Sequence, residues 1–419
     1  MHAGLDFDET LSLLPLLDDP AAVARLLAPD LEAGDLATRR GDTKYEPGVR
    51  AVAGFELTHR RSGETRLGAV TVSPGRVEAF PLTRDLRLPR LAQALDPQVV
   101  APRLEPLLSL GVPGGPWQVR PVRYKPGARC VIRYETATPR GRAVLYGKML
   151  AEGAVRQADV VSGVHQACES VRGAPYVPPV VAVWPDLDLV LQSAVDEALD
   201  LHELAGDTAS PQGMRREAFG RAGSAVAALH GCVVPGLAER TLADDLEELR
   251  AMTPTVAAVD PGLGASYAAA TDALERWKDE PPDPTVTSHG ALRTDQMMAN
   301  GDRLALIDLD TVCRSEPARD LGNLLAYLDW KATRRPALAD VLSSVGAAFL
   351  EGYAGSRPSP SPHRVALYRA ASLVKVAGRR FRSLTVAEWP LVPTLLERAR
   401  RLAEAPPLEP TGRRSSRPS

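Results

Sequence analysis

The chain has 419 residues, of which 44% are hydrophobic and 24% are charged, and its formal net charge is -2. These shares are ordinary for a globular protein, so two or three domains with a sizeable core are expected. A protein that binds nucleic acid or an anionic membrane through charge carries a basic excess, so neither is favoured as the main partner. A membrane-spanning helix needs a run of about 18 apolar residues, and the sequence has no such run. We therefore expect a cytoplasmic protein.

The cysteines and the chain ends give further expectations. Cys130, Cys168, Cys232 and Cys313 form no C-x-x-C pair, which argues against structural zinc and favours reduced thiols. The N-terminal "MHAGLDFDETLSLLPLL" has no basic region before an apolar core, so no secretory signal is expected. The tail, residues 405–419, is polar and rich in Pro, Arg and Ser, which predicts disorder.

An internal repeat marks the first part of the chain. "KYEPGVRAVAGFE", beginning at Lys44, matches "RYKPGARCVIRYE", beginning at Arg123. Each copy predicts three short strands, joined by a Pro-Gly turn and then by a Gly-containing turn. Continued without a gap, the register places Ala69 of the first copy opposite Lys148 of the second. This pattern predicts a duplicated β-module; the alternative is two unrelated hairpins with the same turn chemistry.

Strand patterns give way to helix patterns after the second copy. "AEGAVRQADVVSGVHQACESVRG" predicts an amphipathic helix, and "VPPVVAVWPDLDLVLQSAVDEALDLHEL" predicts two strands, a connector and a helix start. From about residue 212 the pattern is helical, interrupted by the hairpin "MMANGDRLALIDLD" with its Asn-Gly turn. The predicted fold is α+β and bilobal. A first module (1–110) resembling the small lobe precedes a β-rich small lobe (111–195) and a helical large lobe (196–404).

The stretch "HGALRTDQMMANGDRLALIDLD", residues 289–310, has the spacing of a phosphoryl-transfer site. Such a site needs a lysine for the phosphates, oxygen ligands for a metal, and a group that orients the nucleophile and accepts its proton. Kinase-type loops read His-x-Asp-x-x-x-x-Asn, and a second metal-binding Asp follows on a later strand. Here His289 is followed by Ala291, Gln296 and Asp308. The spacing fits, but alanine stands where the catalytic carboxylate is expected.

These motifs resemble those of the aminoglycoside phosphotransferase family, within the protein-kinase-like superfamily. The segments that carry the resemblance are "HGALRTDQ", "LIDLD" and "SEPARDLGN", together with "RYKPGARC" in the small lobe. The resemblance covers residues 120–350 and is weak over the first hundred. It implies a bilobal fold with ATP in the cleft between the lobes, and a hydroxyl of a small molecule or peptide as phosphate acceptor.

The resemblance also implies the nucleotide contacts. Lys148 would bridge the α- and β-phosphates; the alternative is a solvated strand lysine. The turn with Gly127 would lie over the phosphates, because glycine permits a close backbone approach, although Pro-Gly also marks simple turns. The connector from Gln192 to Val195 would offer backbone groups to the adenine edge.

A Mg²⁺ site is expected at the end of the strand "RLALIDLD". Asp308 is the main candidate, because a buried carboxylate is costly unless it is paired or bound to a cation, and Mg²⁺ prefers carboxylate oxygen. The alternative is a cap of the next segment. Asp310 would take a second metal position or act as a cap, and Gln296 would replace the usual Asn through the same kind of amide oxygen. His289 is expected to hold the loop by hydrogen bonds.

Further residues are candidates for the support of this site. Asp320 in "ARDLGN" is expected to cap a helix and brace the catalytic loop, and His230 in "AALHG" is expected to pack at a helix end. An acidic partner for Lys148 is not evident, since Glu152 comes too early and Glu169 too late.

Because position 291 is alanine, the sequence does not decide whether the protein transfers phosphate. A general base contributes about 10²–10⁴-fold, or roughly 3–5 kcal/mol of barrier, yet phosphoryl transfer depends mostly on positioning and charge neutralisation. Asp295 is nearby but is expected to face elsewhere. We expect a pseudokinase that binds Mg-ATP with little turnover, working beside a partner enzyme. The alternatives are an active phosphotransferase with a substitute base, or a structural protein whose duplicated module forms a binding surface.

Overall fold

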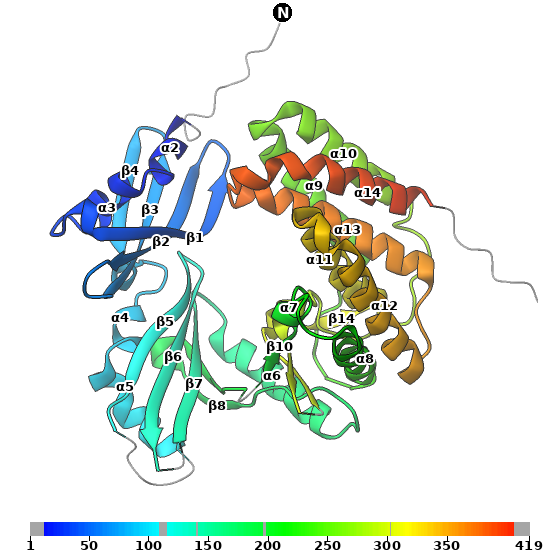
Figure 1. Cartoon of the computed structure of the whole chain (residues 1–419), viewed down its shortest axis with the longest axis horizontal. Helices are drawn as coiled ribbons and strands as arrows, with labels where there is room; N and C mark the ends of the chain where they lie inside the picture. Colours follow the sequence, from blue (N-terminus) through cyan, green and yellow to red (C-terminus); the bar gives the residue numbers. More distant parts are fainter. Residues whose placement is uncertain (1–11, 109–114, 140, 196–197, 302, 406–419) are drawn as a thin grey trace, which may run out of the picture.

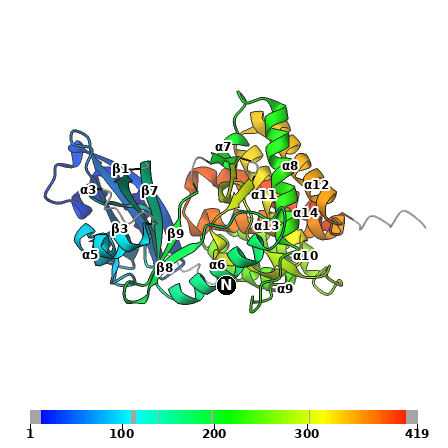
Figure 2. The ribbon, with the colours of Figure 1, turned by 90° about the horizontal axis from the view of Figure 1, so that it is seen from below.

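The computed structural model describes residues 12–108, 115–139, 141–195, 198–301 and 303–405. The fold is bilobal and kinase-like: a β-rich small lobe and a larger helical lobe follow a duplicated β-module (Figures 1 and 2). None of the helices in these described ranges is long and apolar enough to cross a membrane. The four cysteines are buried and free of disulfides, as expected. The N-terminal residues 1–11 and the predicted disordered tail lie outside the described residues, apart from Ala405.

The first module is an antiparallel sheet with two short helices on one face. The sheet has the order β1 (Leu36–Glu46), β2 (Arg50–His59), β3 (Thr65–Ser73), β4 (Arg76–Pro81). The helices are α2 (Leu14–Leu17) and α3 (Pro20–Leu27). Asp19 caps α3 by accepting from Ala21 N at 2.9 Å, and the apolar face of α3 packs on Phe55 and Val70 of the sheet.

The small lobe is built on a second sheet, and the helices between the two modules pack against this sheet. Its order is β5 (Gln118–Lys125), β6 (Arg129–Thr138), β7 (Gly141–Leu150), β9 (Leu189–Ser193), β8 (Val180–Trp184). One face is covered by α4 (Leu91–Ala94) and α5 (Pro97–Leu104), whose leucines share a core with Ile132 and Tyr134. α6 (Ala154–Glu169) follows β7, as the amphipathic pattern predicted, and packs against β8 and β9.

The two modules differ in the register of their third strand. Val131 on β6 pairs with Lys148, whereas Val52, its match in the first module, pairs with Thr71. The gap-free register, which set Ala69 against Lys148, is therefore wrong for β3. The turn between β2 and β3 is two residues longer than its counterpart. An even shift keeps each side chain on its face, and the first module has no lysine at this position in either register.

The first module contacts both lobes. Toward the small lobe, Arg123 Nε lies 3.3 Å from Asp42 Oδ2, as the expected packing requires. Toward the large lobe, Leu384 is 1% exposed and packs in the core of the first module. Arg40 donates to the carbonyl oxygen of Leu384 at 2.6 Å. The second contact was not predicted from the sequence.

The large lobe is helical and carries two small antiparallel sheets at its cleft side. Its helices are α7 (Leu201–Leu204), α8 (Gln212–Leu229), α9 (Leu242–Val259), α10 (Pro261–Glu275), α11 (Ala318–Arg334), α12 (Ala339–Ser356), α13 (Pro362–Arg382) and α14 (Val392–Glu404). One sheet joins β10 (Leu199–Asp200), β12 (Met297–Asn300) and β13 (Arg303–Leu306), and the other pairs β11 (Val286–Ser288) with β14 (Cys313–Ser315). The hairpin β12–β13 is the one marked by Asn-Gly in the sequence.

Two glycines bring α8 and α12 into close contact. A Cβ added at Gly223 would lie 2.0 Å from Phe349 O, and one at Gly352 would lie 1.9 Å from Gly220 O. Neither position has room for a side chain. Both helices contribute side chains to the main core of the lobe, which includes Phe219, Phe349 and residues of β13.

Candidate nucleotide and metal site

Two cations from the small lobe meet two carboxylates from the large lobe. Lys148 Nζ lies 3.0 Å from Asp308 Oδ1 and forms a second ion pair with Asp310. Arg129 NH1 is paired with Asp310 and lies 3.7 Å from Asp308. All four side chains are at most 26% exposed. The structure thus brings together Lys148 and Asp308, which the sequence had linked only by their expected roles.

The environment of Asp308 keeps it ionised. Burial would raise the pKa of this carboxyl, but the Lys148 ammonium and then the Arg129 guanidinium outweigh burial and hold the pKa below 3.8. Its φ of 61° is left-handed, a conformation that Asp adopts more readily than most residues. The charged form is the one that can bind a cation.

A cavity of about 370 Å³ surrounds this cluster between the two lobes. The predicted site residues that line it are Lys148, Gln192, Val195, Asp295, Gln296, Asp308 and Asp310. Its apolar wall comes from both lobes and includes Val131, Val161, Val190 and Ile307. Gln192 itself is tied down, because its Nε2 donates to Pro178 O at 3.0 Å.

Glu152 and Glu169, which the sequence did not favour as acidic partners of Lys148, pair with other residues. Glu152 pairs with Arg87 at 3.0 Å, and Glu169 pairs with Arg303 at 3.0 Å. On α6, the polar residue that lines the cavity is Gln157. Among the described residues, the ion-pair partners of Lys148 are Asp308 and Asp310. These carboxylates of the large lobe therefore pair with Lys148 in place of an acidic residue on α6.

Gly127 does not line the cavity. Its φ of 67° fits the predicted turn, but its backbone N–H donates to Asp85 Oδ2 at 2.7 Å. Tyr124 OH donates to the same oxygen at 2.8 Å. Because this N–H already has a buried acceptor, we do not retain Gly127 as a phosphate contact; Arg129, at the end of the same turn, reaches the cavity instead.

Asp320 braces the catalytic loop. It is fully buried and accepts from His289 N at 2.7 Å and from Gly290 N at 2.9 Å. His230 Nε2 lies 3.1 Å from the same carboxylate, and its Nδ1 lies 2.9 Å from Tyr353 OH. His230, expected to pack only, is thus part of a buried polar network. Burial raises the pKa of Asp320, but its hydrogen bond with His230 and the nearby charges outweigh that effect, so the pKa falls below 3.8.

The histidine that opens the loop has a structural environment. His289 is buried, and its Nε2 lies 3.1 Å from Ile307 O, which ties the loop to the strand before Asp308. This geometry agrees with the expectation that His289 holds the loop. Gln296 is also buried, and its Oε1 accepts from Arg293 N at 2.8 Å while its side chain lines the cavity.

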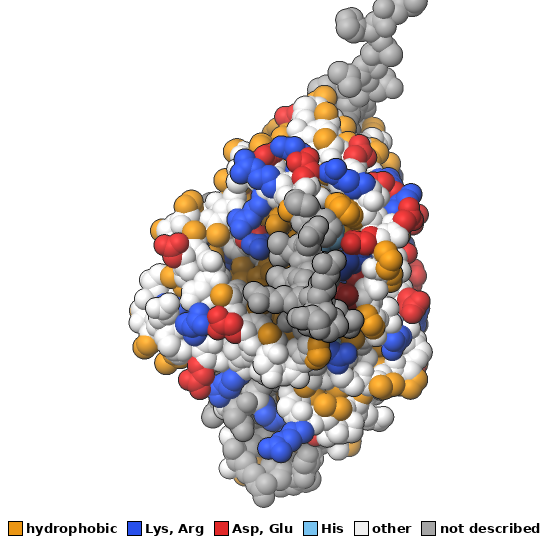
Figure 3. Space-filling model, turned by 90° about the vertical axis from the view of Figure 1, so that its right-hand side faces the viewer, with side chains coloured by type: hydrophobic (Ala, Val, Ile, Leu, Met, Phe, Trp, Pro, Cys, Tyr) orange, Lys and Arg blue, Asp and Glu red, His pale blue; other side chains and the backbone are white. Residues whose placement is uncertain are grey.

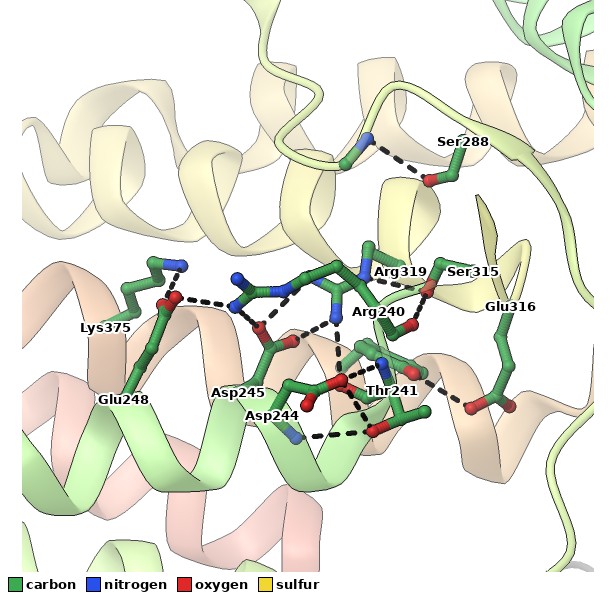
Figure 4. A network of polar contacts seen from close by, with 12 residues as sticks. Arg240, Thr241, Asp244, Asp245, Glu248, Ser288, Ser315, Glu316, Arg319 and Lys375 are labelled. Carbon is green, nitrogen blue, oxygen red and sulfur yellow. Dashed lines mark hydrogen bonds and ion pairs between the residues drawn. The ribbon is translucent and has the colours of Figure 1, made fainter. Parts of the chain in front are cut away.

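Ala291 faces a separate small cavity of about 20 Å³, whose lining includes the basic and aromatic side chains of Arg319, Arg379 and Tyr327. The carboxylate that lines this cavity is that of Asp245 on α9. It is held by Arg240 at 3.1 Å and by Arg319 at 2.8 Å, within the network of Figure 4. Asp245 is therefore already neutralised by two guanidinium groups.

Asp295 faces the cleft, contrary to the orientation expected from the loop. It lines the 370 Å³ cavity and also a second cavity in the large lobe, and its Oδ1 accepts from Arg293 Nε at 2.9 Å. Sequence reasoning had not assigned Arg293, Tyr327 or Arg129. A signal existed only for Arg129, which recurs as Arg50 in the repeat.

Comparison with known proteins agrees with this architecture. The model of the phosphotransferase enzyme family, the aminoglycoside phosphotransferases, matches residues 134–362, more than half of the chain. An aminoglycoside phosphotransferase solved with AMP-PNP and hygromycin B is 16% identical, with a TM-score of 0.51 over 72% of this chain and 99% of that one. An amicoumacin kinase solved with AMP-PNP and Ca²⁺ is 14% identical, with a TM-score of 0.50 over 75% and 96%. A choline/ethanolamine kinase family protein from Mesorhizobium loti is 16% identical, with a TM-score of 0.45 over 76% and 94%.

At these identities the two structures with TM-scores of 0.51 and 0.50 show the fold alone. No curated protein matches the sequence. The family model rests on the sequence itself, and it spans the small lobe from the middle of β6 onward, the catalytic loop and most of the large lobe. The chain belongs to the aminoglycoside phosphotransferase family of the protein-kinase-like superfamily.

Proposed function

We propose that the protein binds Mg-ATP in the 370 Å³ cavity between its lobes and is a degenerate kinase, because Ala291 stands in place of the catalytic carboxylate. The observation that carries this proposal is the contact of Lys148 with Asp308 and Asp310 across the cavity. A cation pair facing a carboxylate pair is the charge arrangement that a triphosphate and its metal ion require.

The residues present fit a nucleotide with its metal. Lys148 and Arg129 offer positive charge to the phosphates, and Asp308, Asp310 and Gln296 offer the oxygen ligands that Mg²⁺ prefers. When bound, the ion would neutralise charge on the phosphates. The valines of the wall suit a base, and the cavity falls within the roughly 300–1,000 Å³ typical of small-molecule sites.

Ala291 makes transfer slow in this proposal. The small cavity beside it retains Arg319 and Arg379, but its one carboxylate, Asp245, is held by two arginines. An acceptor hydroxyl that approaches Ala291 would therefore lack a free base at this position, which costs about 10²–10⁴-fold in rate.

An active phosphotransferase is the second candidate, and one observation favours it. Asp295 lines both the nucleotide cavity and the neighbouring cavity of the large lobe. It is 48% exposed and paired to one arginine, Arg293. A carboxylate at this junction could accept the proton of a small-molecule or peptide hydroxyl.

Two measurements test these proposals. Titration calorimetry with AMP-PNP and Mg²⁺ should give binding that Asp308→Ala abolishes and that Asp340→Ala, an exposed control on α12, leaves unchanged. Absence of binding by the native protein would dispose of both candidates. Steady-state ATP consumption should then be low and rise in Ala291→Asp. Fast turnover that Ala291→Asp does not increase, and that Asp295→Asn abolishes, would establish the active phosphotransferase instead.

A further inference from the structure

A second cavity of about 470 Å³ lies in the large lobe next to the nucleotide cavity. The two cavities share Arg293 and Asp295, so they lie on either side of this ion pair. The second cavity is bounded by α7, by the catalytic loop, and by α11 and α13. If the nucleotide binds as proposed, this is the side on which an acceptor can approach it.

Cationic side chains predominate in the wall of the second cavity. They are Arg293, Lys331, Arg334, Arg335 and Arg380. Three carboxylates, Glu203, Asp207 and Asp295, also line it. Arg293 pairs with Asp295 at 2.9 Å, and Arg334 and Arg380 pair with Glu388 at 2.8 and 2.6 Å. Among the described residues, the cations of the wall without a carboxylate partner are therefore Lys331 and Arg335. On the outer face of the large lobe, by contrast, basic and acidic side chains are intermixed (Figure 3). The wall of the cavity therefore differs from this face in its balance of charges.

Aromatic rings hold several of these cations in place. Arg334 and Arg380 lie 5.7 and 5.3 Å from the centre of the Trp330 ring, and Arg293 lies 5.3 Å from that of Tyr327. Arg334 and Arg380 also pair with Glu388, and their remaining N–H donors can meet a planar carboxylate or a tetrahedral phosphate. The Nε of Arg380 is buried without a partner among the described residues.

The ionisable groups around the cavity respond to a positive potential. Burial lowers the pKa of Lys331, and Arg335 and Arg334 lower it further, against Asp200. Burial raises the pKa of Tyr327, yet Arg379, Arg293 and Arg380 outweigh it and bring the pKa below 10. Both shifts have the direction that neighbouring cations produce.

We infer that the second cavity binds the anionic group, a carboxylate or a phosphate, of an acceptor, and that it rejects polycationic molecules. That the ligand is a phosphate acceptor rests on the proposed nucleotide site. The preference for an anion rests on the residues of the second cavity alone. Guanidinium and ammonium groups recognise such anions by charge-assisted hydrogen bonds, whereas a ligand rich in ammonium groups would meet like charge.

The test uses three small probes with the same ring and different charge: phenyl phosphate, benzoate and benzylamine. Each is titrated into the full chain saturated with AMP-PNP and Mg²⁺, so that the nucleotide cavity is filled. We expect at least one of the two anions to bind at least ten times more tightly than benzylamine. The stronger of the two identifies phosphate or carboxylate as the preferred group.

Two double variants locate the binding. Lys331→Gln with Arg335→Gln should weaken anion binding by about ten-fold or more, because each lost charge removes a charge-assisted hydrogen bond. Arg25→Gln with Arg84→Gln removes the same charge from exposed positions of the first module and its linker, and should leave anion binding unchanged. Equal or tighter binding of benzylamine, or anion binding that the first double variant leaves intact, overturns the inference. If AMP-PNP fails to bind while the anion preference and its loss in the variant persist, the nucleotide proposal fails and the anion site stands.

Discussion

Lys148→Met should change nucleotide binding and metal binding in opposite directions. Lys148 is 13% exposed and forms charge-assisted contacts with Asp308 and Asp310. With ATP present, the same ammonium would contact the phosphates, a contact worth roughly 1.5–3 kcal/mol. Its loss should weaken binding of AMP-PNP by about 10- to 150-fold. Without nucleotide, the two carboxylates would keep Arg129 as their remaining partner in the described site, so the local charge falls from zero to -1.

Affinity for Mg²⁺ alone should therefore rise in the variant, by about ten-fold or more, since a unit charge at about 4 Å is worth roughly 4 kcal/mol at an effective dielectric constant of 20. Titration calorimetry with AMP-PNP and with MgCl₂ alone measures both changes. Lys278→Met is the matched control, because Lys278 also forms an ion pair, with Glu275 at 3.0 Å, but at the surface. Two affinities that stay within two-fold of the native values, or that fall together, would refute the assignment of Lys148.

Three further predictions concern stability. Asp320→Ala should lower the free energy of unfolding by about 3–5 kcal/mol, because buried donors lose their acceptor; urea denaturation checks this, and a loss as small as that of Asp340→Ala contradicts it. Gly352→Ala should cost about 1–3 kcal/mol through overpacking against the facing helix, whereas Gly355→Ala, with open space, should cost little; equal melting temperatures would count against this packing. Acid should also destabilise the protein: the pKa of Asp308 is lowered in the folded state, so its contribution is present above about pH 4 and is lost as pH falls below that value. Asp308→Asn should show a shallower loss of melting temperature between about pH 5 and pH 3, and a profile identical to native would exclude this linkage.

The sequence predicted the fold and the polar centre of the site because both depend on local patterns. The strand periodicity and turn chemistry of the repeat predict two β-modules, and the apolar strand before Asp308 predicts a carboxylate that needs a cation. Lys148 lies on the predicted third strand of the second module, and its role followed from the family resemblance. These features lie on single elements whose ends are fixed by short-range rules, so distant contacts were not needed to find them.

Other parts of the site depend on contacts between distant segments and had no local signal. Arg293 and Tyr327 meet only because the catalytic loop packs on α11, and Arg379 comes from α13. The orientation of Asp295 follows from its pairing with Arg293, which spacing alone does not reveal. The turn between β2 and β3 is two residues longer than the matching turn between β6 and β7, and this difference sets the register of β3. The matching motifs at Lys44 and Arg123 lie before these turns, so they do not reveal the difference in length.

The contact between the first module and the end of α13 is favourable despite a strained backbone. Leu384 has a φ of 49°, a left-handed conformation that costs an L-residue about 1–2 kcal/mol. Complete burial of a leucine contributes roughly 1.5–3 kcal/mol, and Arg40 adds a hydrogen bond to the carbonyl. Burial and the hydrogen bond together exceed the strain, so the first module holds this turn in place. The turn directly follows the helix that carries Arg379 and Arg380, while Thr71 occupies the position of Lys148 in the first module. The first module, which has threonine where the small lobe has Lys148, therefore contacts the large lobe directly after the helix that supplies these arginines.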